Sequence, residues 1–274
     1  MKLLDGRELV GYIKERQAKQ VRALRQTWHT IPKLAIIVAS NNQVIDTYVR
    51  LKQSYGSDIL IDVDVYSIEQ ADVSSRIALL NADVTVHGII LQLPLTDVTQ
   101  TTELVEQINP VKDVDGLGSQ ALYTSATATA IDWLLAGYNI TLQGRTIAIV
   151  GNGRLVGAPL AKLWGGEGLD VTVYDSKTIN LKDKLREADI IVTATGVPGL
   201  ITTAMVSPGK TLVDAGTASE DGVVVGDITN ELRQRDDLTI TPVHGGVGPL
   251  TIAALFDNVI SAARKSVATN EAPS

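Results

Sequence analysis

The sequence predicts an α/β protein built from two doubly wound domains, and three observations support this fold class. Apolar runs rich in β-branched residues alternate with segments of helical periodicity along the 274 residues, which is typical of parallel sheets covered by helices. The alternation occurs in two series, and the second begins with a strand that leads directly into a glycine-rich loop. Hydrophobic residues make up 45% of the chain, enough for two cores of ordinary size.

The predicted strands define the two domains. The first series comprises LAIIVA (34–39), ILIDVDVY (59–66) and VTVHGIILQL (84–93). The second comprises TIAIV (146–150), LDVTVY (169–174), DIIVTA (189–194), TLVDAG (211–216) and LTITPV (238–243). We expect a boundary near residue 120, after the turn-forming KDVDGLGS, and a connecting helix over 126–136.

The helical pattern of 250–265 predicts a helix that returns to the first domain, with a frayed tail after it. We therefore expect one domain of residues 1–120 plus 250–274 and a second domain of residues 121–249.

The composition excludes several classes of protein. A net charge of −7 without a long basic block gives no support for binding nucleic acid or an anionic membrane. The absence of cysteine excludes disulfides and thiolate catalysis, and the three histidines lack metal-ligand spacing, so no metal is expected. Charges interrupt the apolar residues of the N-terminus, unlike a signal peptide, and no segment has the length and apolarity to span a bilayer, so we expect a cytoplasmic protein.

A dinucleotide site is predicted at the loop GNGRLVG (151–157), which makes the second domain a Rossmann-type domain. The loop follows a strand and opens a helix, so its backbone N–H groups can face a pyrophosphate. The candidate contacts are Gly151, Asn152, Gly153, Arg154 and Gly157. A structural turn without a ligand is the alternative.

The choice between NAD and NADP depends on Asp175, which ends the next predicted strand. A carboxylate at this position accepts hydrogen bonds from the ribose hydroxyls of NAD and repels the extra phosphate of NADP. Arg154, Ser176 and Lys177 together offer an alternative site for that phosphate, and Asp175 alternatively only caps the turn after its strand. On the acidic residue we favour NAD over NADP.

Polar residues in the first series form a second candidate site. Tyr48 and Lys52 are four positions apart in a predicted helix, so both side chains leave one face. A partly desolvated lysine has a lowered pKa and can transfer protons at neutral pH, although such a pair is more often a solvated helix face. Gln92 interrupts an apolar run where a buried strand ends, and a satisfied core glutamine is the alternative. Asp115, in KDVDG, belongs either to the site or only to a turn.

Taken together, these segments resemble the bifunctional methylenetetrahydrofolate dehydrogenase/cyclohydrolase (FolD) family. The matching segments follow the family order along nearly the whole chain: YVRLK (48–52), GIILQLPL (88–95), INPVKDVDG (108–116), VGAP (156–159), TVYDSKT (172–178), ATGVPGLI (194–201), VDAG (213–216), GDI (226–228) and TPVHGGVGPLT (241–251). The last string and KDVDG are the most specific.

The resemblance implies an enzyme of one-carbon metabolism with its active site in the cleft between the domains. Family members oxidise methylenetetrahydrofolate by hydride transfer to NAD(P) and hydrolyse the methenyl product to formyltetrahydrofolate. By resemblance Lys52 is the key cyclohydrolase residue, Tyr48 stacks or hydrogen bonds beside it, Gln92 orients the lysine and Asp115 binds the pterin ring. The resemblance also implies a homodimer, cofactor contacts at Thr195 and Gly196, and substrate contacts at Gly246 and Pro249.

Several positions depart from the family pattern. Asn152-Gly153 replaces the usual Arg-Ser pair of the nucleotide loop, and Asp175 replaces a common histidine, so both changes favour NAD. Ser125-Ala126-Thr127-Ala128 replaces a Pro-Cys-Thr-Pro segment, which predicts a more flexible loop. Ile45 replaces a serine and His244 a proline. Two alternatives therefore stay open: an NAD-dependent dehydrogenase of another small molecule, and a non-catalytic folate- or nucleotide-binding homologue.

Overall fold

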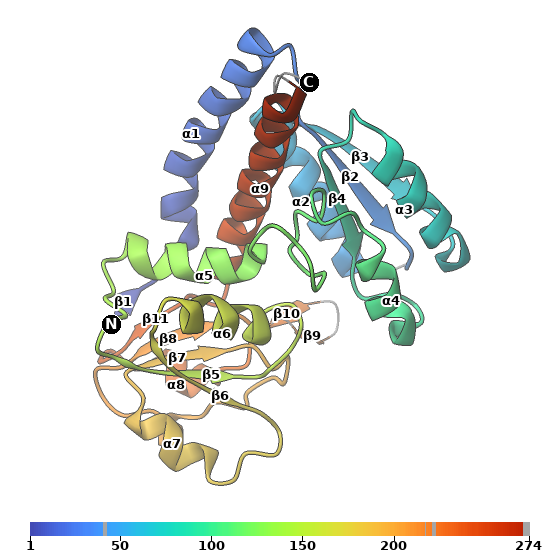
Figure 1. Ribbon diagram of the computed structural model, residues 1–274. Helices are drawn as coiled ribbons and strands as arrows, with labels where there is room; N and C mark the ends of the chain where they lie inside the picture. Colours follow the sequence, from blue (N-terminus) through green and yellow to red (C-terminus); the bar gives the residue numbers. More distant parts are fainter. Residues whose placement is uncertain (41–42, 217, 221–222, 271–274) are drawn as a thin grey trace. The chain divides into compact units, whose positions relative to one another are not determined.

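The computed structural model describes residues 1–40, 43–216, 218–220 and 223–270, which form two compact units (Figure 1). The lysine unit, named for Lys52, contains Gly11–Ala126 and Ile252–Ser274. The glycine-loop unit contains Met1–Val10 and Thr127–Thr251. Within the described residues, no helix is long and apolar enough to cross a membrane.

The lysine unit is built on a three-stranded parallel sheet. Its strand order is β3-β2-β4, and Val38 at the end of β2 pairs with Gln92 at the end of β4. The strands are β2 (Lys33–Val38), β3 (Asp62–Ser67) and β4 (Gly88–Gln92). The helices are most of α1 (Gly6–Thr27), α2 (Gln43–Asp58), η1 (Gln70–Asp72), α3 (Val73–Ala82), η2 (Val98–Gln100), α4 (Thr101–Glu106) and most of α9 (Val247–Asn270).

Helices cover both faces of this sheet, which is why β2 and β4 are almost continuously apolar, whereas the edge strand β3 alternates polar and apolar residues. On one face Ala35 and Ile37 pack in a core with residues of α3 and α4. On the other face, a Cβ added at Gly56 of α2 would lie 2.5 Å from Val63 and 3.2 Å from Phe256, so α2 and α9 meet the sheet closely there. Figure 1 shows α3 and α2 on opposite sides of the three strands.

The glycine-loop unit contains a six-stranded parallel sheet of order β1-β11-β8-β7-β5-β6. Its strands are β1 (Lys2–Leu3), β5 (Thr146–Val150), β6 (Asp170–Tyr174), β7 (Ile190–Thr193), β8 (Thr211–Asp214) and β11 (Thr239–Ile240). β9 (Ala218–Glu220) and β10 (Val223–Val225) form a separate antiparallel pair. The helices are α5 (Ala126–Gly137), α6 (Gly157–Gly166), α7 (Leu181–Glu187), η3 (Thr203–Met205) and α8 (Asn230–Arg233).

The two faces of this sheet are covered by different helices (Figure 1). Ala148 and Val150 of β5 pack in a core with Leu185 of α7 and Leu232 of α8. α5 and α6 lie on the other side of the sheet, where the fully buried Trp164 of α6 donates its indole N–H to Asp132 of α5 (3.1 Å). The fold is therefore α/β with two doubly wound units, as predicted.

Several boundaries differ from the sequence prediction. The first ten residues lie in the glycine-loop unit because Lys2 and Leu3 extend its sheet, a long-range pairing that local patterns do not reveal. β3 begins at Asp62 because α2 continues to Asp58 and Leu60 takes a left-handed conformation. β4 begins only at Gly88, and β11 is two residues long.

The chain around the domain boundaries also differs. Residues 121–126 stay with the lysine unit, where Asn258 of α9 donates to the carbonyl of Thr124 (3.0 Å). Helix α9 continues to Asn270, so the tail is helical for five residues beyond the predicted end, and residues 271–274 lie outside the described part.

Candidate functional site

Lys52 and Gln92, predicted separately from a helix and a strand, form a direct contact. Lys52 lies on α2, and its Nζ donates to Oε1 of Gln92 at 2.6 Å. The amide nitrogen of Gln92 donates to the carbonyl of Leu93 (3.2 Å), which leaves the amide oxygen directed at the lysine. The strand end and the helix thus hold the amine in one place.

Burial changes the protonation of this site. Burial lowers the pKa of the Lys52 amine, and the negative charge of Asp115 opposes that fall. Burial raises the pKa of the Asp115 carboxyl, Lys52 opposes that rise, and the charge of Asp113 adds to it. The two shifts bring the pKa values of the amine and the carboxyl closer together, which favours proton transfer at this site.

Asp113 shapes the loop that carries Asp115. Its buried carboxylate accepts backbone N–H groups of Gly116 (3.1 Å) and Gly118 (2.7 Å). Gly116 has φ +70°, and a Cβ there would lie 2.6 Å from the carbonyl oxygen of Tyr123. KDVDG is therefore a tight turn as well as the source of Asp115. The two interpretations of this motif are compatible.

Tyr48 lies one turn before Lys52 on α2, and its side chain is partly buried. Burial raises the pKa of its hydroxyl, so the group stays protonated at neutral pH. No hydrogen bond joins Tyr48 to Lys52 or Gln92 within the described residues. Its predicted role of stacking or hydrogen bonding beside the lysine stays a prediction.

Two glycines of the glycine loop, Gly151 and Gly157, occupy positions where no Cβ would fit, as in a dinucleotide-binding loop. Gly151 has φ +102°, and a Cβ there would lie 2.5 Å from the carbonyl oxygen of Ala194. A Cβ at Gly157 would lie 1.8 Å from the carbonyl oxygen of Gly151, so α6 packs tightly on the loop. Gly153 has open space around it, which permits close approach of a ligand to the backbone. The chain therefore fits a bound NAD(P) at this loop.

The start of α6 offers fewer free donors than the sequence suggested. The N–H of Ala158 donates to the carbonyl of Gly153 (3.1 Å), and Pro159 has no N–H. The N-cap residue, Val156, makes no side-chain capping bond. A pyrophosphate at this helix would meet chiefly the loop backbone and the positive end of the helix dipole.

Asp175 caps the turn after β6 and remains exposed. Its Oδ1 accepts the N–H of Lys177 (3.0 Å) and the hydroxyl of Thr178 (3.3 Å). The turn-capping alternative is thus realised, and Oδ2 has no hydrogen-bond partner among the described residues. Ser176 and Lys177 are exposed beside it.

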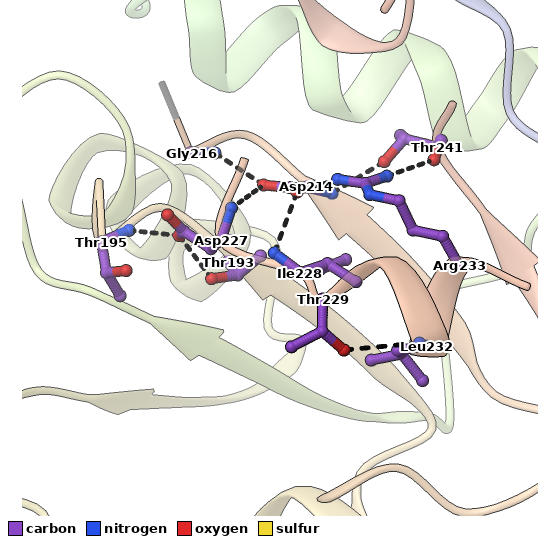
Figure 2. Close-up of polar contacts among 10 residues, drawn as sticks. All are labelled: Thr193, Thr195, Asp214, Gly216, Asp227, Ile228, Thr229, Leu232, Arg233 and Thr241. Atoms are coloured by element: carbon purple, nitrogen blue, oxygen red, sulfur yellow. Dashed lines mark hydrogen bonds and ion pairs between the residues drawn. The ribbon is translucent and has the colours of Figure 1, made fainter. Parts of the chain in front are cut away.

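Thr195 and Gly196 follow β7, directly across from the glycine loop. The backbone N–H of Thr195 donates to Oδ2 of Asp227 (2.7 Å), and Gly196 has φ +66°. Asp227 belongs to a buried network with Asp214 and Arg233 that sequence reasoning did not identify (Figure 2). The sequence feature that could have indicated this network is the acidic residue within each of two short motifs, Asp214 in VDAG and Asp227 in GDI.

The other predicted positions are spread over the chain. Gly246 is buried and Pro249 lies in the first turn of α9, both in the glycine-loop unit, whereas His244 is exposed. Residues 126–128 begin α5, and Ala126 and Ala128 are fully buried. The prediction of a flexible loop at 125–128 is therefore wrong, because the small side chains of 126–128 pack as the first turn of α5. Within the described residues, no cluster of three or more His, Asp or Glu could hold a metal.

Comparisons with known proteins match both parts of the chain. Residues 4–115 match the family model described as tetrahydrofolate dehydrogenase/cyclohydrolase, catalytic domain, and residues 125–267 match the NAD(P)-binding domain of that family. The bifunctional protein FolD of Exiguobacterium sibiricum is 34% identical, over 96% of this chain and 99% of that protein. The corresponding protein of Paraburkholderia xenovorans is 35% identical, over 98% and 99%.

Two solved structures of FolD enzymes also match nearly the whole chain. The bifunctional FolD enzyme of Campylobacter jejuni is 34% identical with a TM-score of 0.89, covering 97% of this chain and 99% of that one. FolD of Trypanosoma brucei, complexed with NADP and an inhibitor, is 27% identical with a TM-score of 0.90, covering 97% and 98%.

Proposed function

Because the chain belongs to the tetrahydrofolate dehydrogenase/cyclohydrolase family, we propose that it oxidises 5,10-methylenetetrahydrofolate to the 5,10-methenyl compound with NAD(P) and hydrolyses that product to 10-formyltetrahydrofolate. The observation that carries this proposal is the 2.6 Å contact between Lys52 Nζ and Gln92 Oε1 beside the Asp115 carboxyl. Binding alone does not need a lysine held in this way, whereas hydrolysis needs a group that moves protons.

Hydrolysis is assigned to the lysine unit. Water adds to the methenyl carbon, and the Lys52 amine accepts a proton from it. The bond from that carbon to one ring nitrogen then breaks as the carbonyl forms, and the departing nitrogen takes a proton. Because burial lowers the pKa of Lys52, a larger fraction of the amine is neutral and able to accept a proton than for an exposed lysine, and the ammonium returns that proton more readily. Gln92 holds Nζ in place, Asp115 binds the pterin ring, and Tyr48 packs beside the substrate.

Hydride acceptance is the chemistry that bound NAD(P) supplies. Gly151, Asn152, Gly153, Arg154 and Gly157 hold the pyrophosphate, since the glycine geometry leaves the loop backbone accessible. Thr195 and Gly196 border the cofactor on the β7 side, and Gly246 and Pro249 contact the substrate. An assay of the wild type with methylenetetrahydrofolate and each cofactor tests this half of the proposal. Absence of cofactor reduction at saturating concentrations would overturn it.

We further propose NAD as the preferred cofactor. The exposed Asp175 carboxylate stands where β6 ends, with Oδ2 available to ribose hydroxyls and its charge opposed to a 2′-phosphate. NADP is favoured instead by three residues that could bind its 2′-phosphate, namely Arg154, Ser176 and Lys177. The Trypanosoma brucei relative was solved with NADP. Steady-state turnover with NAD and NADP should be compared for the wild type and for Asp175→Ser. A strong NADP preference in the wild type would refute the acidic-residue argument.

A homodimer is proposed from the free edge of the sheet in the lysine unit. β3 pairs with β2 on one side only within the described residues. The N–H groups of Asp62 and Ile68 donate toward β2, so by strand alternation those of Val63 and Val65 face the open edge. Such an edge is a template for pairing with a second copy.

Light scattering on the purified protein tests the dimer. Val65→Pro removes a donor from the outer edge and should give monomers with the sheet retained. Asp64→Pro removes a donor that faces β2 and should instead destabilise the unit. A wild-type protein that is monomeric at micromolar concentration would contradict the proposal.

A further inference from the structure

A buried ion pair lies at the carboxyl end of the sheet in the glycine-loop unit (Figure 2). Asp214 ends β8 and pairs with the guanidinium of Arg233 on α8, with side chains 3% and 11% exposed. Thr241 holds both partners, since its hydroxyl accepts the N–H of Asp214 (2.9 Å) and its carbonyl accepts Nη1 of Arg233 (3.0 Å). The pair is thus fixed in position between β8 and the segment after β11.

Asp214 in turn fixes the segment that contains Asp227. Its carboxylate accepts backbone N–H groups from Gly216 (3.0 Å), Asp227 (3.1 Å) and Ile228 (3.3 Å). Gly226 permits this approach, because a Cβ there would lie 2.1 Å from Oδ2 of Asp214. The backbone N–H groups of Asp227 and Ile228 are therefore held by charge-assisted hydrogen bonds to one carboxylate.

The fully buried Asp227 carboxylate joins the ends of two strands. Its Oδ2 accepts the hydroxyl of Thr193 (2.6 Å), at the end of β7, and the backbone N–H of Thr195 (2.7 Å). Its Oδ1 faces Gly216 after β8, where a Cβ would lie 2.1 Å away, and has no hydrogen-bond partner among the described residues. Figure 2 shows Asp227 between Thr195 and Gly216.

The sheet topology indicates which part of a dinucleotide these loops would meet. The chain order reverses between β5 and β7, and ligands of such sheets bind in the crevice at that point. The glycine loop follows β5 and contacts Ala194 after β7. Asp175 follows β6 on the other side and is placed for the adenosine ribose. The loops after β7 and β8 therefore lie on the side of the nicotinamide half.

We propose that Asp227 is a positioning residue for the nicotinamide half of the bound dinucleotide. The hydrogen bond from the Thr195 N–H to Asp227 fixes the Ala194–Thr195 peptide, one residue before Gly196. Asp214, paired with Arg233, in turn holds the backbone of Asp227. The proposal rests on the proposed cofactor site and extends it to a residue that would not touch the cofactor itself.

Isothermal titration calorimetry with whole and fragment ligands tests this assignment. NAD is compared with ADP, which lacks the nicotinamide half, and NADP is compared in parallel with adenosine 2′,5′-bisphosphate. Asp227→Ala removes the acceptor of both Thr193 and Thr195. We expect the loss of the Thr195 bond to weaken dinucleotide binding about tenfold or more, with fragment affinity within about twofold of wild type. Thr193→Val is the matched control, because it removes a bond to the same oxygen and leaves Thr195 untouched. It should keep both affinities.

Asp227→Asn keeps the test valid should the alanine variant fail to fold. Its amide oxygen still accepts the Thr195 N–H but carries no charge. Dinucleotide affinity should therefore fall by about threefold, less than in the alanine variant, again without loss of fragment affinity. Equal losses for dinucleotide and fragment, or unchanged dinucleotide affinity in both variants, would overturn the proposal. Methenyl hydrolysis should be unchanged throughout. A wild type that binds both ligands but does not oxidise methylenetetrahydrofolate contradicts the proposed function alone.

Discussion

Replacing Lys52 by methionine should abolish most of the methenyl hydrolysis while sparing folate binding. Methionine is unbranched and of similar length, so it fills the space along α2 but carries no proton. The loss leaves Gln92 Oε1 without the donor now at 2.6 Å, which costs about 1–3 kcal/mol of stability. Removal of a partly desolvated ammonium offsets that cost. The fold of the lysine unit should therefore survive.

The magnitude follows from the part that the amine plays. Proton transfer by a positioned side chain contributes about 100- to 10,000-fold, or about 2.7–5.5 kcal/mol of activation free energy. We expect kcat for hydrolysis to fall at least about 100-fold, and KM to change by less than about threefold, since the lost interaction belongs to the transition state. Arg50→Met, on the exposed side of the same helix, removes a cation without touching Gln92 and should leave kcat unchanged.

The assay follows the absorbance of the methenyl compound over a range of pH. Burial lowers the pKa of Lys52, so the fraction of neutral amine should rise with pH through that lowered pKa. The rate of hydrolysis by the wild type should rise with it, whereas the rate of the variant should not depend on pH in this way. The unfolded chain binds the Lys52 proton more tightly, so wild-type stability should rise with pH from the lowered folded pKa up to about 10.5. Hydrolysis at the wild-type rate by Lys52→Met would remove the lysine from the mechanism.

Three further substitutions give independent checks. Gly157→Ala puts a Cβ 1.8 Å from a backbone oxygen and should weaken NAD binding at least about tenfold by calorimetry, whereas Gly165→Ala, in open space on the same helix, should not. Asp113→Ala removes the acceptor of two loop N–H groups and should lower the free energy of unfolding by about 3 kcal/mol in urea; a change within about 0.5 kcal/mol would contradict this. Burial lowers the pKa of His87, whose Nδ1 accepts a backbone N–H, so the free energy of unfolding should fall as the pH drops below 6.5. His87→Asn keeps an acceptor but cannot be protonated in this range, so its free energy of unfolding should depend less on pH there.

Local patterns predicted the elements that depend on neighbouring residues. Period and composition located β5 to the residue and α5 to within one residue, because a buried parallel strand and an apolar helix face have distinct sequence signatures. The loop at 151–157 was predictable because Gly151 and Gly157 occupy positions that exclude a Cβ. The end of α2 was missed, since Ile59 and Ile61 are as apolar as a strand and only the left-handed Leu60 separates them from the helix.

By itself, then, the sequence determined the two α/β series, the glycine loop and the identities of Lys52, Gln92 and Asp115. Only the tertiary structure decided that Lys52 reaches Gln92, 40 positions away, and that Asp227 holds Thr195, 32 positions before it. It also decided that Lys2 and Leu3 extend the sheet of the glycine-loop unit. Propensity and spacing act over a few residues, whereas these contacts depend on strand register and helix packing that bring distant segments within hydrogen-bonding distance.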